Sequence, residues 1–203
     1  MKKLLALAAV GIAATGLTGC LNEGTNREEL TDFFALMGST ELVENSTLDI
    51  SMMGMINMTV ATDSNKIQAD IMMSDPTTSE VLEETYFQEY KDSKYYAYNK
   101  LEDVWYVQEI DATDALDVTE FTDAFKEFSE LDVELFDYVN NQWVVEEEED
   151  GTTYTTTITF NADGSVKMAV SIEGMGEYMS LAVSNVGTTV VTLPANATPA
   201  LLA

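Results

Sequence analysis

The sequence of 203 residues contains no histidine, one cysteine, and nine basic side chains against 36 acidic ones. Without histidine, the chain cannot form a Ser-His or Cys-His catalytic pair or a histidine metal site. A single cysteine excludes an internal disulfide and a cysteine-cluster zinc site. The formal charge of −27 argues against a nucleic-acid partner, because phosphate binding requires clustered lysine and arginine. These absences predict a protein that is not an enzyme and that has no metal, no cofactor and no nucleic-acid partner.

A short leader begins the chain. Met1-Lys2-Lys3 is basic and precedes an apolar run from Leu4 to Ile12. This run is too short to span a bilayer as a helix, which requires about 20 residues, and its flanks fit a secretory signal. We therefore expect residues 1–19 to be a signal peptide.

The single cysteine stands directly after this leader. Leu17, Thr18 and Gly19 precede Cys20, and Leu-Thr-Gly-Cys matches the lipobox of bacterial lipoproteins. This resemblance implies cleavage before Cys20, attachment of diacylglycerol to its sulfur, and a short tether within residues 20–26. The expected location is extracytoplasmic, on the outer face of the cell membrane, or at the outer membrane of a Gram-negative cell. The alternative is a plain secretory signal followed by a chance cysteine.

Residues 27–203 predict a single β-rich domain. Arg27 to Met37 is expected to be helical, because Leu30, Phe33, Phe34 and Met37 recur at spacings of three and four. Gly38 then ends the helix.

A period-two alternation follows, in which Gly54 interrupts the even positions and Met53 and Met55 are apolar residues at odd ones. Apolar side chains occupy the even positions from Leu48 to Val60, which predicts one long strand with a bend near Gly54. Asp63-Ser64-Asn65 predicts a turn. Further strands are expected at 67–73, 81–90, 95–99, 104–110, 143–145, 153–160, 166–172, 179–183 and 190–193.

The pattern changes to a helical period in the middle of the chain. Phe121, Phe125, Phe128 and Leu131 recur at helical spacing and predict an amphipathic helix. Residues 132–140 are expected to add a second short helix. The predicted fold class is therefore α+β, with strands in the majority.

This order of elements resembles the LolA-like lipoprotein family, which includes LolA, LolB, LppX and LprG. The resemblance rests on the N-terminal helix, the aromatic hairpin of Tyr95–Tyr98 and Trp105–Val107, and the ending Ser184–Pro194. It implies a half-open, curved antiparallel sheet or barrel with helices packed on its concave face. It also implies a hydrophobic cavity between sheet and helices that receives acyl chains. Because Arg27 is the only arginine and lies near the anchor, a fixed, tethered carrier fits better than a LolA-type shuttle.

Methionine is the unusual component, with 11 residues. Its flexible, polarizable side chain suits a pocket for acyl chains. The side chains expected to line such a cavity are Ile50, Met52, Met58, Ile71, Met73, Phe121, Phe125 and Phe128. The alternatives are that they fill an ordinary core or, for the thioethers, bind copper.

Five consecutive acidic residues, 146–150, precede Gly151. Calcium sites need carboxylates that converge from a turned loop, whereas successive strand residues point apart. We therefore expect a solvated hairpin tip, with Asp150-Gly151 as its turn. Asp163-Gly164 predicts a similar turn.

The sequence thus predicts a membrane-anchored, non-enzymatic lipoprotein that binds or carries an apolar ligand, such as a lipid, in its cavity. The alternative is a cell-surface interaction or sensor lipoprotein with a filled core and no ligand cavity. The sequence identifies no protein partner.

Overall fold

The computed structural model describes residues 27–39, 41–75, 77–78, 80–117 and 130–200. The leader, the lipobox and Cys20 lie outside these ranges, as do Phe121, Phe125 and Phe128. The helical elements are α1 (Arg27–Met37), α2 (Glu41–Glu44) and the 3-10 turn η1 (Val133–Leu135). The strands are β1 (Thr47–Met52), β2 (Ile56–Asp63), β3 (Lys66–Ser74), β4 (Val81–Lys91), β5 (Lys94–Leu101), β6 (Val104–Ile110), β7 (Asp137–Val139), β8 (Gln142–Glu149), β9 (Thr152–Phe160), β10 (Val166–Ile172), β11 (Gly176–Ser184) and β12 (Thr198–Pro199).

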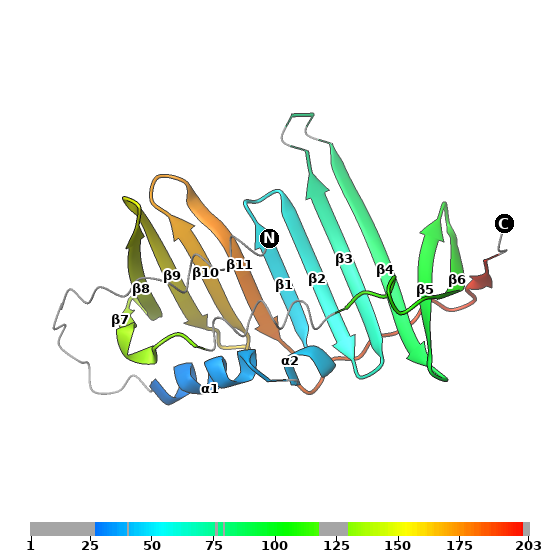
Figure 1. Ribbon diagram of the computed structural model, residues 1–203, viewed down its shortest axis with the longest axis horizontal. Coiled ribbons are helices and arrows are strands. Elements are labelled where there is room, and N and C mark those ends of the chain that lie inside the picture. The colour runs from blue at the N-terminus through cyan, green and yellow to red at the C-terminus, as the bar shows by residue number, and fades with distance from the viewer. Residues whose placement is uncertain (1–26, 40, 76, 79, 118–129, 201–203) are drawn as a thin grey trace.

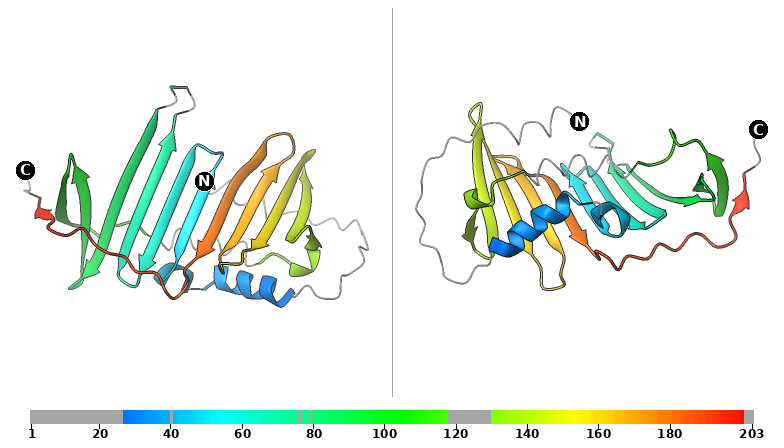
Figure 2. Two further views of the ribbon diagram at one scale, coloured as in Figure 1. Left: turned by 180° about the vertical axis from the view of Figure 1, so that it is seen from behind. Right: turned by 60° about the horizontal axis from the view of Figure 1, so that its bottom comes forward.

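The strands form one sheet of 12 strands in the order β12-β6-β5-β4-β3-β2-β1-β11-β10-β9-β8-β7. Neighbouring strands are antiparallel, except that β12 runs parallel to β6. Figure 1 shows that the sheet is open, with β7 and β6 near opposite ends, and Figure 2 shows its curvature. Strand twist accumulates across a sheet, so sheets of more than about ten strands commonly curl.

The predicted α+β fold, with helices packed on the concave face of an antiparallel sheet, is wrong. In the described ranges, α1 is the only helix longer than four residues, and the sheet is mixed. The short helix expected at 132–140 is instead η1 followed by β7. Asn140 and Asn141 have positive φ angles of 52° and 65°, which a tight hairpin turn requires. This turn pairs β7 with β8.

The bounds and the apolar side predicted for the first helix are confirmed by α1. Leu30, Phe33, Phe34 and Met37 are its buried residues. They share one core with strand residues that include Leu48, Val60, Ile158, Met168 and Leu181. At the start of α1, the Arg27 guanidinium lies 5.2 Å from the ring centroid of Trp143. A cation over an aromatic ring is stabilised, so Arg27 joins α1 to β8.

The long strand expected at 48–60 is a hairpin. Met53 and Gly54 have φ angles of 53° and 65°, and the Met55 amide donates to the Met52 carbonyl at 3.0 Å. Met52 lies opposite Ile56, so three residues connect the two strands. An odd number of connecting residues keeps the alternation in phase, and the even positions stay on one face on both sides of the turn.

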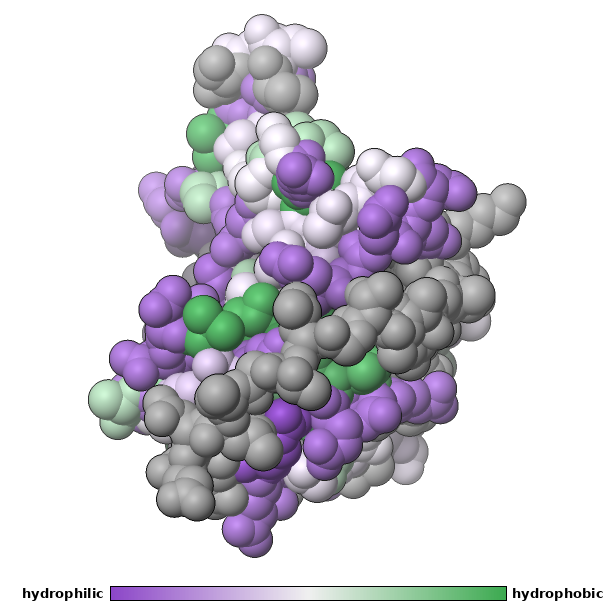
Figure 3. All heavy atoms as spheres, turned by 90° about the vertical axis from the view of Figure 1, so that its left-hand side faces the viewer, coloured by the Kyte–Doolittle hydropathy of each residue, from purple (hydrophilic) through white to green (hydrophobic). Residues whose placement is uncertain are grey.

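The acidic run lies in the β8–β9 hairpin, as predicted. Its carboxylates alternate between the two faces: Glu146 and Glu148 are exposed, whereas Glu147 and Glu149 are half-buried. Burial, with repulsion from Glu149 as the smaller cause, raises the pKa of Glu147. Among the residues that Figure 3 colours by hydropathy, hydrophilic ones predominate on this side of the molecule.

The strand expected at 190–193 is absent from the sheet. Residues 185–197 instead follow the lower ends of the strands from β11 toward β6 (Figure 2). Their backbone bonds to loop and side-chain groups: the Gly187 amide donates to the Asn45 carbonyl at 2.8 Å, and the Val191 amide donates to Asp63 Oδ2 at 3.3 Å. The short strand β12 then adds to β6.

Candidate functional site

The apolar residues predicted on β1, β2 and β3 lie on the face of the sheet that packs against α1, which we call the helix face. Cross-strand pairing arranges them in rows. Met52 lies opposite Met179 and Ile56, and Ile56 lies opposite Met73. Leu82 of β4 continues the row beside Met73. We call these five residues, Met179, Met52, Ile56, Met73 and Leu82, the methionine row.

Burial falls along the strands from the core to this row. Leu48 and Val60, at the covered end, are 0% exposed. The next row, Ile50, Met58 and Ile71, is half-buried. In the methionine row, Met73 is 38% exposed and Leu82 is 50% exposed. The apolar surface therefore continues beyond the core that α1 covers.

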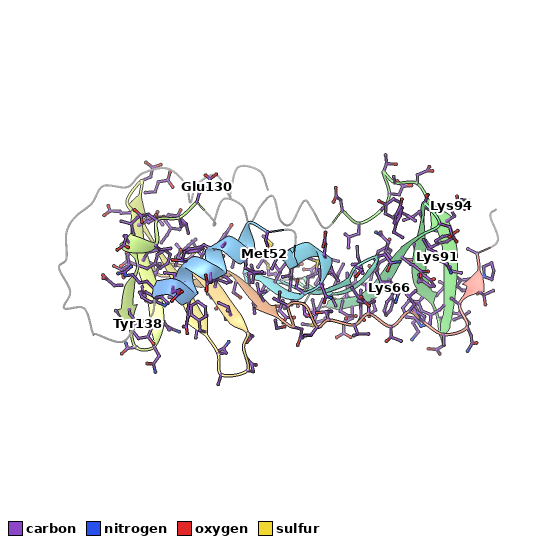
Figure 4. All side chains as sticks on the ribbon, turned by 90° about the horizontal axis from the view of Figure 1, so that it is seen from below. Met52, Lys66, Lys91, Lys94, Glu130 and Tyr138 are labelled. Atoms are coloured by element: carbon purple, nitrogen blue, oxygen red, sulfur yellow. The ribbon has the colours of Figure 1, made fainter. Side chains whose placement is uncertain are left out.

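The structure thus brings together five of the eight residues predicted to line a cavity. Ile50, Met52, Met58, Ile71 and Met73 occupy two adjacent rows of the helix face. Figure 4 shows Met52 on the same side of the sheet as α1. The other three, Phe121, Phe125 and Phe128, lie outside the described residues, so the enclosed cavity stays a prediction.

A second candidate site, which the sequence analysis missed, opens between β4 and β5. These strands pair only from Phe87 opposite Tyr98 to Lys91 opposite Lys94. Over residues 81–86, β3 is the only described strand that pairs with β4, and Figure 1 shows β5 and β6 turning away from it. The divergence leaves an open cleft of about 910 Å³, lined by Asn57, Thr59, Asp70, Ile71, Met72, Glu83, Glu84, Thr85, Tyr86, Asn99, Lys100, Glu102 and Trp105.

The cleft is acidic. Four carboxylates and one ammonium, that of Lys100, line it, so its lining carries a net charge of 1 − 4 = −3. Lys100 itself lies 3.6 Å from Asp103. Figure 4 labels Lys66, Lys91 and Lys94, which stand where β3 begins, β4 ends and β5 begins. The cleft lies at the other end of these strands, so the three lysines do not neutralise its negative charge.

Asp70 is held in position at the floor of the cleft. The amide of Gln68 donates to its Oδ2 at 2.7 Å, and the hydroxyl of Thr85 donates to its Oδ1 at 2.6 Å. Both donors are uncharged. They fix the direction of the carboxylate without cancelling its charge, and this leaves Asp70 able to attract a cation.

Aromatic side chains lie where the pairing of β4 with β5 begins. The rings of Phe87 and Trp105 meet edge to face, with centroids 5.3 Å apart and planes at 78°. Beside them, the Tyr98 hydroxyl donates to Glu89 at 3.1 Å. Burial, together with the charge of Glu89 and this bond, raises the pKa of Tyr98 to about 12. Tyr98 therefore remains a neutral donor at physiological pH.

The fold and the two sites define a β-rich protein with an open, curved, mixed sheet. No protein-family model matches the chain, and no curated protein matches it significantly. In the part of the chain that the structure describes, no helix is long and apolar enough to cross a membrane, and no group of three or more His, Cys, Asp or Glu side chains is placed to hold a metal ion.

Proposed function

We propose that this chain is an extracytoplasmic lipoprotein, anchored through Cys20, that binds an apolar ligand on the helix face of its sheet. The observation that carries the proposal is the methionine row, where the apolar face extends past the core and stays partly exposed. The proposed activity is binding or carriage without catalysis.

The dimensions of the row fit an acyl chain. Neighbouring strands are about 4.8 Å apart, so a row across five strands spans about 19 Å. A lipid tail that fills one leaflet of a bilayer core, about 15 Å thick, has a similar length. Each methylene buried against the row contributes about 0.8 kcal/mol. Methionine side chains can adapt to the shape of such a chain.

Anchorage would place this surface beside a source of acyl chains. Residues 21–26 form a tether of six residues, which reaches about 20 Å when extended. The bound diacylglycerol, with two chains, would hold the protein stably at the membrane. The ligand would then transfer over a short distance between bilayer and sheet.

A second candidate function is that of a cell-surface interaction or sensor lipoprotein without a ligand cavity. The packing beneath α1 favours it, because Phe34 and Phe136 are 4% and 1% exposed and their ring centroids lie 5.7 Å apart. Side chains therefore fill the space between α1 and that half of the sheet.

Ligand binding is tested on the full chain carrying Cys20→Ser, purified without detergent. Native mass spectrometry should detect a bound lipid, and a fluorescent fatty acid should bind. Met52→Glu/Met73→Glu should weaken fatty-acid binding at least tenfold, because charges in the row oppose burial of a chain. Val190→Glu, at a side chain that is 78% exposed, is the matched control and should change nothing. A lipid-free mass together with no fatty-acid uptake would favour the second candidate.

The anchor has a separate test. Labelled palmitate should enter the unmodified chain in a bacterial host, and Cys20→Ser should abolish the label and leave the chain unprocessed or release it from the membrane. Thr18→Ser, a conservative change within the lipobox, is the control that should keep the label and the processing. Unchanged retention of the Cys20→Ser chain would contradict lipidation.

A further inference from the structure

Among the residues that the structure describes, nothing pairs over residues 81–86 with one backbone edge of β4, the edge that faces the cleft. The Asp75 amide donates to the Glu80 carbonyl at 2.9 Å, and the Tyr90 amide donates to the Asn65 carbonyl at 2.7 Å. Both bonds extend the ladder between β3 and β4, so even-numbered residues of β4 direct their N–H and C=O groups toward β3. The odd-numbered residues Val81, Glu83 and Thr85 therefore direct theirs toward β5.

On that side, no described residue completes the ladder. The pairing of β4 with β5 begins at Phe87. Val81, Glu83 and Thr85 therefore direct three N–H and three C=O groups into the cleft. If the pairing continued beyond Phe87 and Tyr98, Lys100 of β5 would lie opposite Thr85 of β4. Unpaired strand edges are templates for a further strand.

From this edge and the acidic lining, we infer that the cleft binds an extended, lysine- or arginine-rich segment of another protein, which adds as a strand to β4. The inference goes beyond the proposed function. The carboxylates and the odd-numbered backbone groups that carry it are not part of the methionine row, although Leu82 of that row lies within the same stretch of β4. The open part of β4 has six residues, 81–86, so it accommodates a segment of about 20 Å at about 3.3 Å per residue.

The lining selects the chemistry of this segment. Side chains of a strand alternate between faces, and carboxylates stand on both faces: Glu83 and Asp70 on one, and Glu84 on the other. Basic side chains of the added strand would meet a carboxylate on either side. Met72 and Trp105, which also line the cleft, offer apolar contact to the other side chains of the segment.

Charge also favours a cationic polypeptide over the other possible occupants of the cleft. A second copy of the chain carries the same −27, so pairing between two copies would bring like charges together. Anionic polymers are repelled for the same reason. A cationic polypeptide is attracted before contact and is then held by backbone bonds.

The test uses the full chain and two labelled peptides of equal charge at 0.15 M salt. The first alternates Lys and Val over eight residues. In the second, the two adjacent central residues, one valine and one lysine, carry N-methylated amides, so an N–H needed for pairing is missing whichever alternate set of residues faces β4. Fluorescence anisotropy measures both affinities. Residue-resolved hydrogen exchange then reports the amides of Val81, Glu83 and Thr85, which strand addition should protect.

The first peptide should bind at least tenfold more tightly than the N-methylated peptide. Glu83→Gln/Glu84→Gln should weaken its binding about fivefold, since solvent screens exposed ion pairs and keeps the contribution of each one small. The matched pair Glu146→Gln/Glu148→Gln, on β8, should change it less than twofold.

Equal binding of the two peptides, or no added protection at residues 81, 83 and 85, would overturn the inference and indicate general attraction of cations to an acidic surface. Self-association of the chain through β4 would overturn it in favour of a second copy. Neither result bears on fatty-acid binding by the methionine row, so the two proposals fail separately.

Discussion

The two halves of the sheet differ in how they are covered. On one side of β1, strands β8–β11 share a core with α1, and Ile158, Met168 and Leu181 are at most 1% exposed. On the other side, the first five residues of β4 are all exposed, and β5 and β6 diverge from it. One sheet thus contains a packed half, β8–β11 with α1, and an open half, β4–β6.

This difference assigns stability and binding to different regions. Buried apolar area supplies most of the free energy of folding, so the packed half should dominate global stability. Regions with few buried contacts open locally at lower free energy. The acidic cleft and its unpaired edge lie in the open half, where a partner can reach the backbone.

The largest expected effect comes from opening the packed half. Phe34→Ala removes a ring that is 4% exposed and contacts Phe136, and it should lower the free energy of unfolding by about 3–5 kcal/mol. Urea denaturation measures the change. Leu101→Ala in the open half, where the side chain is 67% exposed, should cost less than about 0.5 kcal/mol. Equal costs for the two would break the comparison.

A smaller, local effect is expected in the open half. Trp105→Ala removes the edge-to-face contact with Phe87 and should cost about 1–2 kcal/mol. Hydrogen exchange should accelerate in β5 and β6 and stay unchanged in β9 and β10. The control Trp105→Phe keeps an aromatic edge and should preserve most of the protection. Acceleration throughout the sheet would show that the two halves unfold together.

The smallest effect concerns the pH dependence of the packed half. The raised pKa of Glu147 means that the folded protein disfavours its charged form. The unfolded chain releases this proton at lower pH, so folding loses stability as the pH rises from the ordinary range of Glu through the raised pKa. Glu147→Gln should therefore gain a few tenths of a kcal/mol at neutral pH, with solvent screening keeping the gain small.

The gain from Glu147→Gln should vanish below the ordinary pKa of a glutamate, where both states are protonated. Thermal unfolding between pH 3 and pH 8 measures it. Glu148→Gln, on the exposed face of the same strand, is the matched control. A loss of stability at neutral pH in Glu147→Gln would reverse the assigned sign.

Local pattern predicted much of the strand content. The alternation at 67–73 and the aromatic runs at 81–110 became β3–β6, since side-chain period and turn residues act within a few residues. The hairpin at Met53 and Gly54 could not be recognised from the alternation. Its three-residue connection keeps the even-numbered residues on one face of the sheet in both strands. A bent strand and this hairpin have the same apolar pattern.

Features set by distant contacts were not predictable in this way. The apolar rows depend on β1 pairing with β11, about 130 residues later in the chain. The acidic cleft had one available signal: the predicted strand at 81–90 is twice as long as the one at 95–99. A longer strand beside a shorter one leaves backbone unpaired, but the direction in which β5 diverges depends on packing around Phe87 and Trp105.

The outermost strands have a consequence for aggregation. At one end of the sheet, β7 has three residues, and at the other end β12 has two, the second of which is Pro199. Very short edge strands and proline both prevent sheets of different molecules from joining edge to edge. These short strands therefore oppose edge-to-edge joining where they pair, at residues 142–144 of β8 and 106–107 of β6.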